Sequence, residues 1–313
     1  MALRAAITAS LLVAAGFCRA QQGVAYSAGE LANDGSQALY QVNLPTATAS
    51  RKGFVKANGV SVSALSGLTF GTNGQLYAIG LLNSASQPAL MTVATTVPAA
   101  TVVSSINGLP AIASSGLSLS FGCDGHVWMS SADSNNFWEL TPSSGQIRLV
   151  GNLGVKITAL ATYNSVLYGI GGNGNANLYT IATDTAKTTL IGSYTVAASN
   201  PVDAGFDSTG ALWGLVRNFN PNGNSLPSGL NALYQINTTS GAMTSAGMIA
   251  NPGQTNLPYP VTLSGLAIGP PVCNAVAPST SSKEAPASSP VGLGSLIFAL
   301  LLSACLIFKP KRF

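Results

Sequence analysis

The chain has 313 residues, of which 47% are hydrophobic and only 7% are charged, and its formal net charge is +4. Five of its 13 basic residues lie within 1–20 and 309–313, so residues 21–290 carry eight basic and nine acidic side chains. Because such a region offers no basic surface to neutralise phosphates, we expect no nucleic acid partner.

The first 20 residues have the composition of a secretory signal peptide. Arg4 precedes an apolar run that ends at Phe17, and the small residue Ala20 follows. Signal peptides combine a basic start, an apolar stretch and a small residue at the cleavage site. We therefore predict cleavage after Ala20, a mature chain that starts at Gln21 and a location outside the cytoplasm.

Residues 23–269 repeat two short phrases. The first occurs five times, at intervals of 41 to 55 residues: Leu39-Tyr-Gln-Val-Asn43, Leu90-Met-Thr-Val-Ala94, Phe137-Trp-Glu-Leu-Thr141, Leu178-Tyr-Thr-Ile-Ala182 and Leu233-Tyr-Gln-Ile-Asn237. The second precedes four of these: Leu76-Tyr-Ala-Ile79, Val127-Trp-Met129, Leu167-Tyr-Gly-Ile170 and Leu212-Trp-Gly-Leu215. With an apolar inner segment and a Thr/Val-rich outer one, each unit holds four short strands. Units of this length and strand number are typical of β-propeller blades.

The two ends of this region complement each other. Residues 263–269 nearly repeat the inner segment at 65–71, yet no further strands follow them. The start of the region, in contrast, holds three strands without an inner one. Because a closed ring leaves no open sheet edge between its first and last blades, we predict that 263–269 completes the first blade. Inner strands near residues 68, 119, 160, 205 and 266 then make an all-β, five-bladed propeller.

The phrases Leu167-Tyr-Gly-Ile170 and Leu178-Tyr-Thr-Ile181, followed by an outer strand that ends in Gly, resemble the units of secreted and surface β-propeller repeat proteins. Most members of that loosely defined group are uncharacterised. The resemblance covers residues 23–269 and implies the propeller fold, but it implies little about chemistry.

The sequence Gly169-Ile-Gly-Gly-Asn-Gly174 matches the G-x-G-x-x-G pattern of dinucleotide-binding loops. That pattern binds a pyrophosphate only when a helix follows the glycines. Residues 175–182 lack helical apolar spacing and are rich in Asn, aromatic and β-branched residues. We therefore predict a β-hairpin at this position and no cofactor.

Candidate catalytic groups are few. Of the nine acidic residues between 21 and 290, only Asp203, at the start of an inner strand, is expected to point into the channel. Glycoside cleavage needs two carboxyl groups about 5–10 Å apart. His126 is the only histidine, and no nucleophile elbow accompanies it, so we expect it to be a half-exposed structural residue. We predict no catalytic residues, no metal site and no enzymatic activity.

Cys123 and Cys273 are the only cysteines between residues 21 and 290. Both follow inner strands and are expected on the same face of the ring. In an oxidising compartment a disulfide would hold the closing segment, but the two cysteines belong to blades that are not adjacent. A disulfide and two separate thiols both remain open.

The loops between the second and third strands are expected on the opposite face, where variable connections on a rigid scaffold carry function. Asn and Asp side chains with an aromatic residue suit sugar hydroxyls or Ca²⁺, although Asn and Asp are also ordinary turn residues. The candidate ligand-binding residues are Asp34, Asp133, Asn135, Asn173, Asn175, Arg217, Phe219 and Asn222.

The C-terminal part reads as a tether followed by an anchor. Residues 270–290 are rich in Ser, Pro and Ala and have too few apolar residues to fold. The uncharged run at 291–308 is about 27 Å long as a helix, and the basic tail at 309–313 is expected in the cytoplasm. This order resembles the sorting tails of bacterial surface proteins. A plain single-span anchor and a processed tail both remain open, whereas a GPI signal usually ends in apolar residues.

We therefore predict a surface-anchored propeller that acts as a recognition or scaffold module for an extracellular protein or glycan, without catalysis. The alternative is a secreted carbohydrate-active hydrolase or lyase that uses the propeller channel.

Overall fold

The structure is a computed structural model that describes residues 24–31, 34–82, 85, 87–109, 116–172, 174–194, 199–218, 231–249 and 263–273. The expected signal peptide, most of the tether, the apolar run and the basic tail lie outside these residues, as do Asn173, Phe219 and Asn222. Within the described ranges there is no helix with the length and hydrophobicity to cross a membrane.

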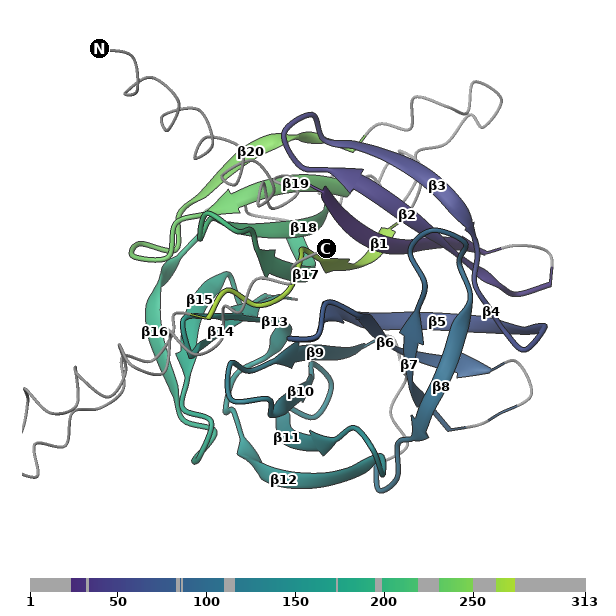
Figure 1. Ribbon diagram of the computed structural model, residues 1–313. Coiled ribbons are helices and arrows are strands. Elements are labelled where there is room, and N and C mark those ends of the chain that lie inside the picture. Colours follow the sequence, from purple (N-terminus) through teal and green to yellow (C-terminus); the bar gives the residue numbers. More distant parts are fainter. Residues whose placement is uncertain are drawn as a thin grey trace, which may run out of the picture. The chain divides into compact units, whose positions relative to one another are not determined.

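Five antiparallel sheets surround a common axis, so the predicted all-β, five-bladed propeller is confirmed (Figure 1). From the axis to the rim, blade 1 consists of β21 (Leu263–Ala267), β1 (Val24–Leu31), β2 (Gln37–Asn43) and β3 (Thr48–Phe54). Blade 2 consists of β5 (Val60–Phe70), β6 (Leu76–Leu82), β7 (Ala89–Val93) and β8 (Ala100–Ser105), with the short β4 (Lys56–Ala57) beside β5. Blade 3 consists of β9 (Leu117–Phe121), β10 (Val127–Ser131), β11 (Asn136–Thr141) and β12 (Gln146–Asn152). Blade 4 consists of β13 (Ile157–Tyr163), β14 (Val166–Gly171), β15 (Asn177–Ile181) and β16 (Thr188–Ser193). Blade 5 consists of β17 (Ser199–Phe206), β18 (Leu212–Asn218), β19 (Asn231–Ile236) and β20 (Met243–Met248).

The last described strand closes the ring. β21 pairs antiparallel with β1, with Gly29 opposite Leu263 and Tyr26 opposite Ala267, so the predicted completion of the first blade is confirmed. Blade 5 holds the same strand from its other side. The Asn231 side chain accepts a hydrogen bond from Leu263 N (2.9 Å) and donates one to Leu263 O (3.0 Å), which satisfies both backbone groups of that residue.

The hydrophobic core consists of five clusters, each located between two neighbouring blades. Blade 5 meets blade 1 through Trp213 and Leu233, which pack with Tyr40 and Leu266. Because both faces of a sheet are covered, its strands are apolar with little alternation, and every residue of β9 and β10 is buried. The cluster between blades 5 and 1 therefore depends on closure of the ring.

The rim repeats this circular order. In every blade the outer strand shifts register against the third strand by one residue, the mark of a β-bulge. The glycine that follows the bulge lies close to a turn of the next blade in blades 4 and 5. A Cβ on Gly192 would lie 2.0 Å from Ser240 O, and one on Gly247 would lie 3.4 Å from the Ala47 Cβ. Gly192 is thus required for the close approach of blade 4 to blade 5.

The Gly-rich sequence forms the predicted hairpin. β14 and β15 pair directly, with Ile170 opposite Leu178 and Leu167 opposite Ile181. A second hairpin, between β4 and β5, was not anticipated, although it turns at Asn58-Gly59 with φ values of +49° and +82°. Asn-Gly is a strong hairpin signal because both residues tolerate positive φ.

Gly67→Ala tests the contact between the inner strands of blades 2 and 3. Gly67 has a φ of +54°, and a Cβ there would lie 2.9 Å from Leu119 Cβ and 3.0 Å from Leu119 N. We expect the free energy of unfolding to fall by about 2–4 kcal/mol in chemical denaturation, because backbone strain and overpacking add. Gly59→Ala is the control: its φ is +82° but nothing lies within 4 Å, so only about 1 kcal/mol of strain is expected. Equal losses in the two variants contradict a tight contact at Leu119.

Candidate functional site

The inner strands enclose a narrow space on the axis, the hub. Its volume is about 30 Å³, and residues of all five inner strands line it. A space of this size holds water but is far below the volume of about 300 Å³ at which ligand sites commonly begin. Two of its hydroxyls, Ser120 Oγ and Thr162 Oγ1, are bonded to each other at 2.9 Å. A ligand therefore has to bind at an end of the hub or elsewhere on the surface.

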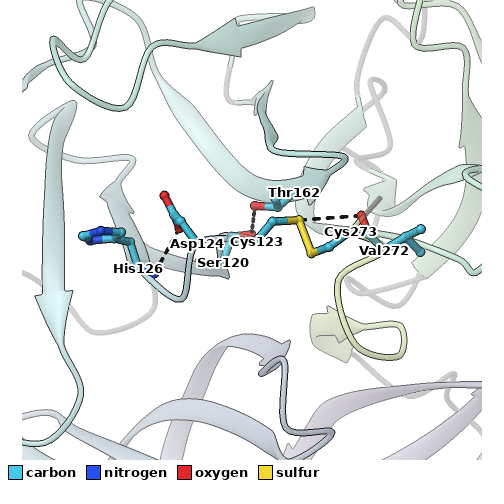
Figure 2. Close-up of a disulfide and its surroundings, with 7 residues drawn as sticks. All are labelled: Ser120, Cys123, Asp124, His126, Thr162, Val272 and Cys273. Carbon is cyan, nitrogen blue, oxygen red and sulfur yellow. Dashed lines mark hydrogen bonds between the residues drawn. A yellow bond between two sulfur atoms is a disulfide. The ribbon is translucent and has the colours of Figure 1, made fainter. Parts of the chain in front are cut away.

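One end of the hub is crossed by residues 269–273, which we call the strap. Val272 pairs in parallel with Tyr163 of blade 4 and accepts a hydrogen bond from Asn164 N (2.9 Å). Cys273 forms a disulfide with Cys123, which lies in the turn between β9 and β10 of blade 3 (Figure 2). The Cα atoms of the two cysteines are 5.5 Å apart. The strap thus links the end of blade 1 to blades 3 and 4.

This path explains how cysteines of non-adjacent blades meet. At the rim, blade 2 separates blades 1 and 3. The strap instead leads from blade 1 across the axis, where the inner strands of all five blades lie close together. Of the two alternatives that the sequence left open, the structure forms the disulfide. The strap therefore crosses one end of the hub. We call the opposite end, toward which the second strand of each blade runs, the open mouth.

Asp203 is the fifth of the eight residues of β17 and is 1% exposed. Its Oδ1 accepts from Ala204 N and its Oδ2 from Leu266 N, both at 2.9 Å, and Leu68 N is a third donor. One carboxyl group thus joins the inner strands of blades 5, 1 and 2. Burial raises the pKa of Asp203 well above its ordinary value, and the three N–H donors act in the opposite direction. With both oxygens bonded to backbone, Asp203 serves as a structural clamp.

Five of the eight candidate ligand-binding residues lie in the described part of the chain, in four different blades. In blade 1, Asp34 forms an ion pair with Lys56 of β4 at 2.8 Å and accepts a hydrogen bond from Ser36 N at 3.0 Å. The hydrogen bond from Lys56 lowers the pKa of Asp34 well below its usual range. Both side chains of the ion pair are nearly half exposed, so the pair adds little to stability.

Asp133 and Asn135 belong to the turn between β10 and β11. Asn135 has a φ of +56° and donates its N–H to Ser131 O at 3.0 Å. Asn adopts this left-handed conformation more readily than most residues, so turn geometry accounts for Asn135. Asp133 is exposed, and its carboxylate has no hydrogen-bond partner among the described residues. Asn135 Oδ1 is buried and likewise has no partner in this part of the chain, so both side chains have unused acceptors.

The remaining two described candidates differ in how fully they are bonded. The Asn175 Oδ1 accepts from Tyr179 OH (2.9 Å) and Asn177 Nδ2 (2.8 Å), and its Nδ2 donates to Lys156 O (2.9 Å). The amide of Asn175 is therefore occupied within blade 4. Arg217, at the end of β18, has a buried Nε with no acceptor in the described ranges. A buried N–H without an acceptor is unfavourable, so Arg217 is the candidate that most needs a partner.

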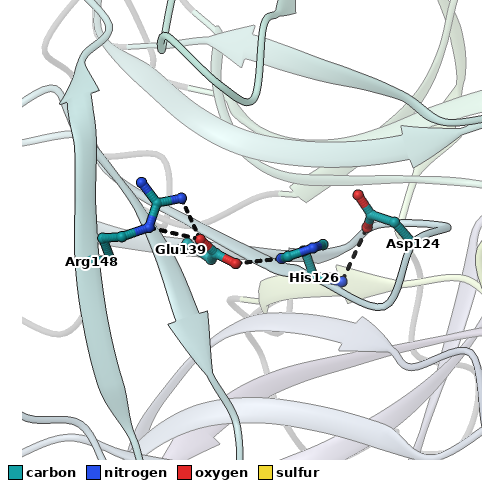
Figure 3. A network of polar contacts seen from close by, with 4 residues as sticks. All are labelled: Asp124, His126, Glu139 and Arg148. Carbon is teal, nitrogen blue, oxygen red and sulfur yellow. Dashed lines mark hydrogen bonds and ion pairs between the residues drawn. The ribbon is translucent and has the colours of Figure 1, made fainter.

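His126 takes part in a chain of polar contacts on blade 3 (Figure 3). Its Nδ1 contacts Glu139, which also accepts a hydrogen bond from Arg148 Nε at 2.9 Å. The bond from Arg148 lowers the pKa of Glu139, although partial burial opposes the shift. The His126 ring stacks on Trp128 with centroids 5.6 Å apart, and Asp124 accepts from His126 N at 3.0 Å. These contacts fit the expected structural role. Sequence reasoning missed Arg148, since only the strand register places it opposite Glu139.

The described residues contain no group of three or more His, Cys, Asp or Glu side chains that could hold a metal ion.

The sequence matches no protein-family model and no curated protein. Solved β-propellers do match the structure. A protein of unknown function from Bacteroides thetaiotaomicron has 14% identity and a TM-score of 0.44, covering 61% of this chain and 53% of its own, so this chain spans about half its length. A chain of a nidogen/laminin complex has 13% identity and a TM-score of 0.46, with coverages of 80% and 100%. A gluconolactonase from Xanthomonas campestris has 12% identity and a TM-score of 0.42, with coverages of 78% and 79%. At these identities the similarity concerns the fold alone.

These matches correct the expectation that the chain has no enzymatic activity. Enzymes are among the matched structures: besides the gluconolactonase, a streptogramin B lyase matches at 15% identity with a TM-score of 0.35, and a luciferin-regenerating enzyme at 14% with 0.41. A small number of acidic residues and one histidine were therefore no sufficient reason to exclude catalysis. One fold hosts many activities, and its active groups can come from several blades that only folding brings together.

Replacing both cysteines by Ser tests the strap. The disulfide closes a loop with a sequence separation of 150 residues. In the chain-entropy model such a loop is worth about 4–5 kcal/mol, so we expect the free energy of unfolding to fall by about that amount in chemical denaturation. Wild-type protein treated with a reductant should match the Cys123→Ser/Cys273→Ser variant. If the oxidised wild type and the variant unfold at the same denaturant concentration, the strap does not stabilise the ring.

Asp203→Asn tests the clamp through its pH dependence. A raised pKa in the folded state means that the Asp203 contribution is fully present below the ordinary pKa of 3.8 and is lost as pH rises through the folded value. We expect the stability of the wild type relative to Asp203→Asn, from denaturation curves at pH 4 to 8, to decline as pH increases. The exposed Asp184→Asn variant is the control and should leave the pH profile unchanged. A carbon NMR titration of the wild-type carboxyl group gives the same answer if the Asn variant fails to fold, and an ordinary pKa there contradicts the assignment.

Proposed function

We propose that the chain is an exported, surface-tethered propeller that binds an extracellular glycan at the open mouth. One observation carries this proposal: the strap crosses the other end of the hub. The hub holds about 30 Å³, and the strap with its disulfide covers one end. The loops between the second and third strands are at the open mouth, and such loops on a rigid scaffold commonly carry function.

Two described side chains supply the binding chemistry at this end. The buried Nε of Arg217 lacks an acceptor among the described residues, and the exposed carboxylate of Asp133 lacks a donor there. A glycan presents ether and hydroxyl oxygens as acceptors and hydroxyl groups as donors. One ligand class can therefore satisfy both side chains, because Arg only donates and an ionised Asp only accepts.

The disulfide supports the export part of the proposal. Structural disulfides form and persist mainly in oxidising compartments outside the cytoplasm. The apolar run at 291–308 with its basic tail supports the tether, since a run of this length can span a bilayer.

Binding of the full chain to an array of extracellular glycans tests this function. The chain is produced with its own leader in a host that exports proteins, and mass spectrometry should find Gln21 at the mature N-terminus. We expect Arg217→Gln to weaken binding to the recognised glycan about tenfold, because a charged donor is lost from a partly buried site. Arg148→Gln is the matched control, since Arg148 lies on an outer strand and is largely exposed; it should leave affinity unchanged.

The outcomes separate the proposal from its alternatives. Release of reducing ends from the bound glycan identifies it as a substrate and the open mouth as an active site. Binding that is equally strong in Arg217→Gln and wild type rejects the open mouth as the site. An array without any bound glycan, together with capture of a single extracellular protein that depends on Arg217, replaces the glycan by a protein ligand.

A further inference from the structure

The rim of the ring carries a cleft that no candidate residue from the sequence touches. It has a volume of about 350 Å³ and is lined by residues that follow β8 in blade 2 and by residues of β11 and β12 in blade 3. Asn107, just after β8, pairs in parallel with Gln146, and Asn107 N donates to Gly145 O at 3.0 Å. The walls come from two blades that the backbone holds together. We call this space the rim cleft; its main lining residues are Asn107, Asn136, Trp138, Gln146, Ile147 and Leu149.

Three side-chain amides in the rim cleft have unused hydrogen-bonding groups. The Gln146 side chain has no hydrogen-bond partner among the described residues. The backbone N of Gln146 donates to Ser144 Oγ. Asn107 uses its Nδ2, which donates to Ser105 O at 3.2 Å, and leaves its Oδ1 free. Asn136 uses its Oδ1, which accepts from Asn152 Nδ2 at 3.1 Å, and leaves its Nδ2 free. Donors and acceptors are therefore both on offer in one cleft.

Trp138 adds an indole N–H that the folded chain does not satisfy. The residue is 3% exposed and lines the cleft, yet its Nε1 has no acceptor within the described ranges. The Nε1 atom is not among the fully buried polar atoms without a partner, so it is accessible at the surface that Trp138 lines. At the equivalent position of blade 4, the Tyr179 hydroxyl bonds to Asn175 of its own blade at 2.9 Å. Trp138 has no such partner in blade 3 among the described residues.

We propose that the rim cleft binds a neutral saccharide unit, with Trp138 Nε1 and the three amides as its hydrogen-bonding groups. No charged side chain lines the cleft, so an ionic ligand finds no counter-charge there. Ile147 and Leu149 provide an apolar wall, and Leu149 is 57% exposed. A sugar ring combines hydroxyl groups at its edge with apolar C–H faces. The volume of the cleft, about 350 Å³, also lies within the range of about 300–1,000 Å³ that is common for ligand sites.

An extended peptide is the rival occupant, because β12 is an edge strand. Its edge, however, is interrupted at the cleft: the register between β11 and β12 shifts between Trp138, opposite Leu149, and Phe137, opposite Gly151. Such a bulge bends the strand and disrupts the continuous ladder that an added strand needs. The unsatisfied groups of the cleft are side-chain amides and an indole, which match hydroxyl groups.

Calorimetric titration of the full, disulfide-bonded chain with neutral hexasaccharides of glucose, xylose, mannose and galactose tests the proposal. We expect one of them to bind and to change the tryptophan fluorescence. Gln146→Ala should weaken that binding about fivefold, because it removes one amide that makes no contact within the fold. Trp138→Phe should weaken it by a similar factor and abolish the fluorescence change. Gln235→Ala, an exposed glutamine of blade 5, is the matched control and should have no effect.

The same variants define failure. The proposal is overturned if none of the four hexasaccharides binds at millimolar concentration, or if Gln146→Ala and Gln235→Ala bind equally well. Gln146 is exposed, so its variant gives a result even if Trp138→Phe is unstable. Arg217→Gln should leave this affinity within about twofold of wild type because it lies in a different blade, so failure at the open mouth and failure at the rim cleft are distinguishable.

Discussion

The hydrogen bonds that hold β21 between blades 5 and 1 are the interaction on which the remaining structure depends. β21 covers the inner edge of β1, Asn231 satisfies both backbone groups of Leu263, and Asp203 accepts from Leu266 N. Without this strand, blade 1 has an open edge at the axis, the Asn231 side chain loses both of its partners and Asp203 loses one of its three donors. Buried polar groups without partners are strongly unfavourable. The hydrophobic cluster between blades 5 and 1 is the one that forms only when the ring is closed.

Closure also decides which parts of the surface can act. The chain leaves β21 across one end of the hub, where the disulfide to Cys123 holds it. Asp203, the acidic residue best placed for chemistry in the channel, has both oxygens bonded to inner-strand N–H groups. On the strap side the axis is thus covered, and the buried carboxyl group of Asp203 already has hydrogen-bond partners. The open mouth, with Arg217, and the rim remain as surfaces where polar groups lack partners within the described fold.

The repeats allow a comparison of equivalent positions. Where a blade uses a polar residue for its own structure, the partners are present: Asn175 bonds to Tyr179 and Asn177, and Glu139 bonds to Arg148. Trp138 departs from this pattern, since its N–H has no acceptor in the described residues. With so few charges, the ring offers mainly hydrogen-bonding groups and apolar side chains, which is the chemistry that the glycan ligands we propose require.

The sequence by itself determined the number of blades and the way they close, because the strand phrases are local and the missing inner strand of the first blade has one complement, at 263–269. It also determined the Gly-rich hairpin, since residues 175–182 cannot form a helix. Tertiary structure decided the disulfide, because the distance between Cys123 and Cys273 depends on the path of the strap across the axis. It likewise decided the bonding of Asp34 and Asn175 and the existence of the rim cleft. Two blades have to pack against each other before a cleft between them exists, and the local sequence pattern of either blade does not predict that contact.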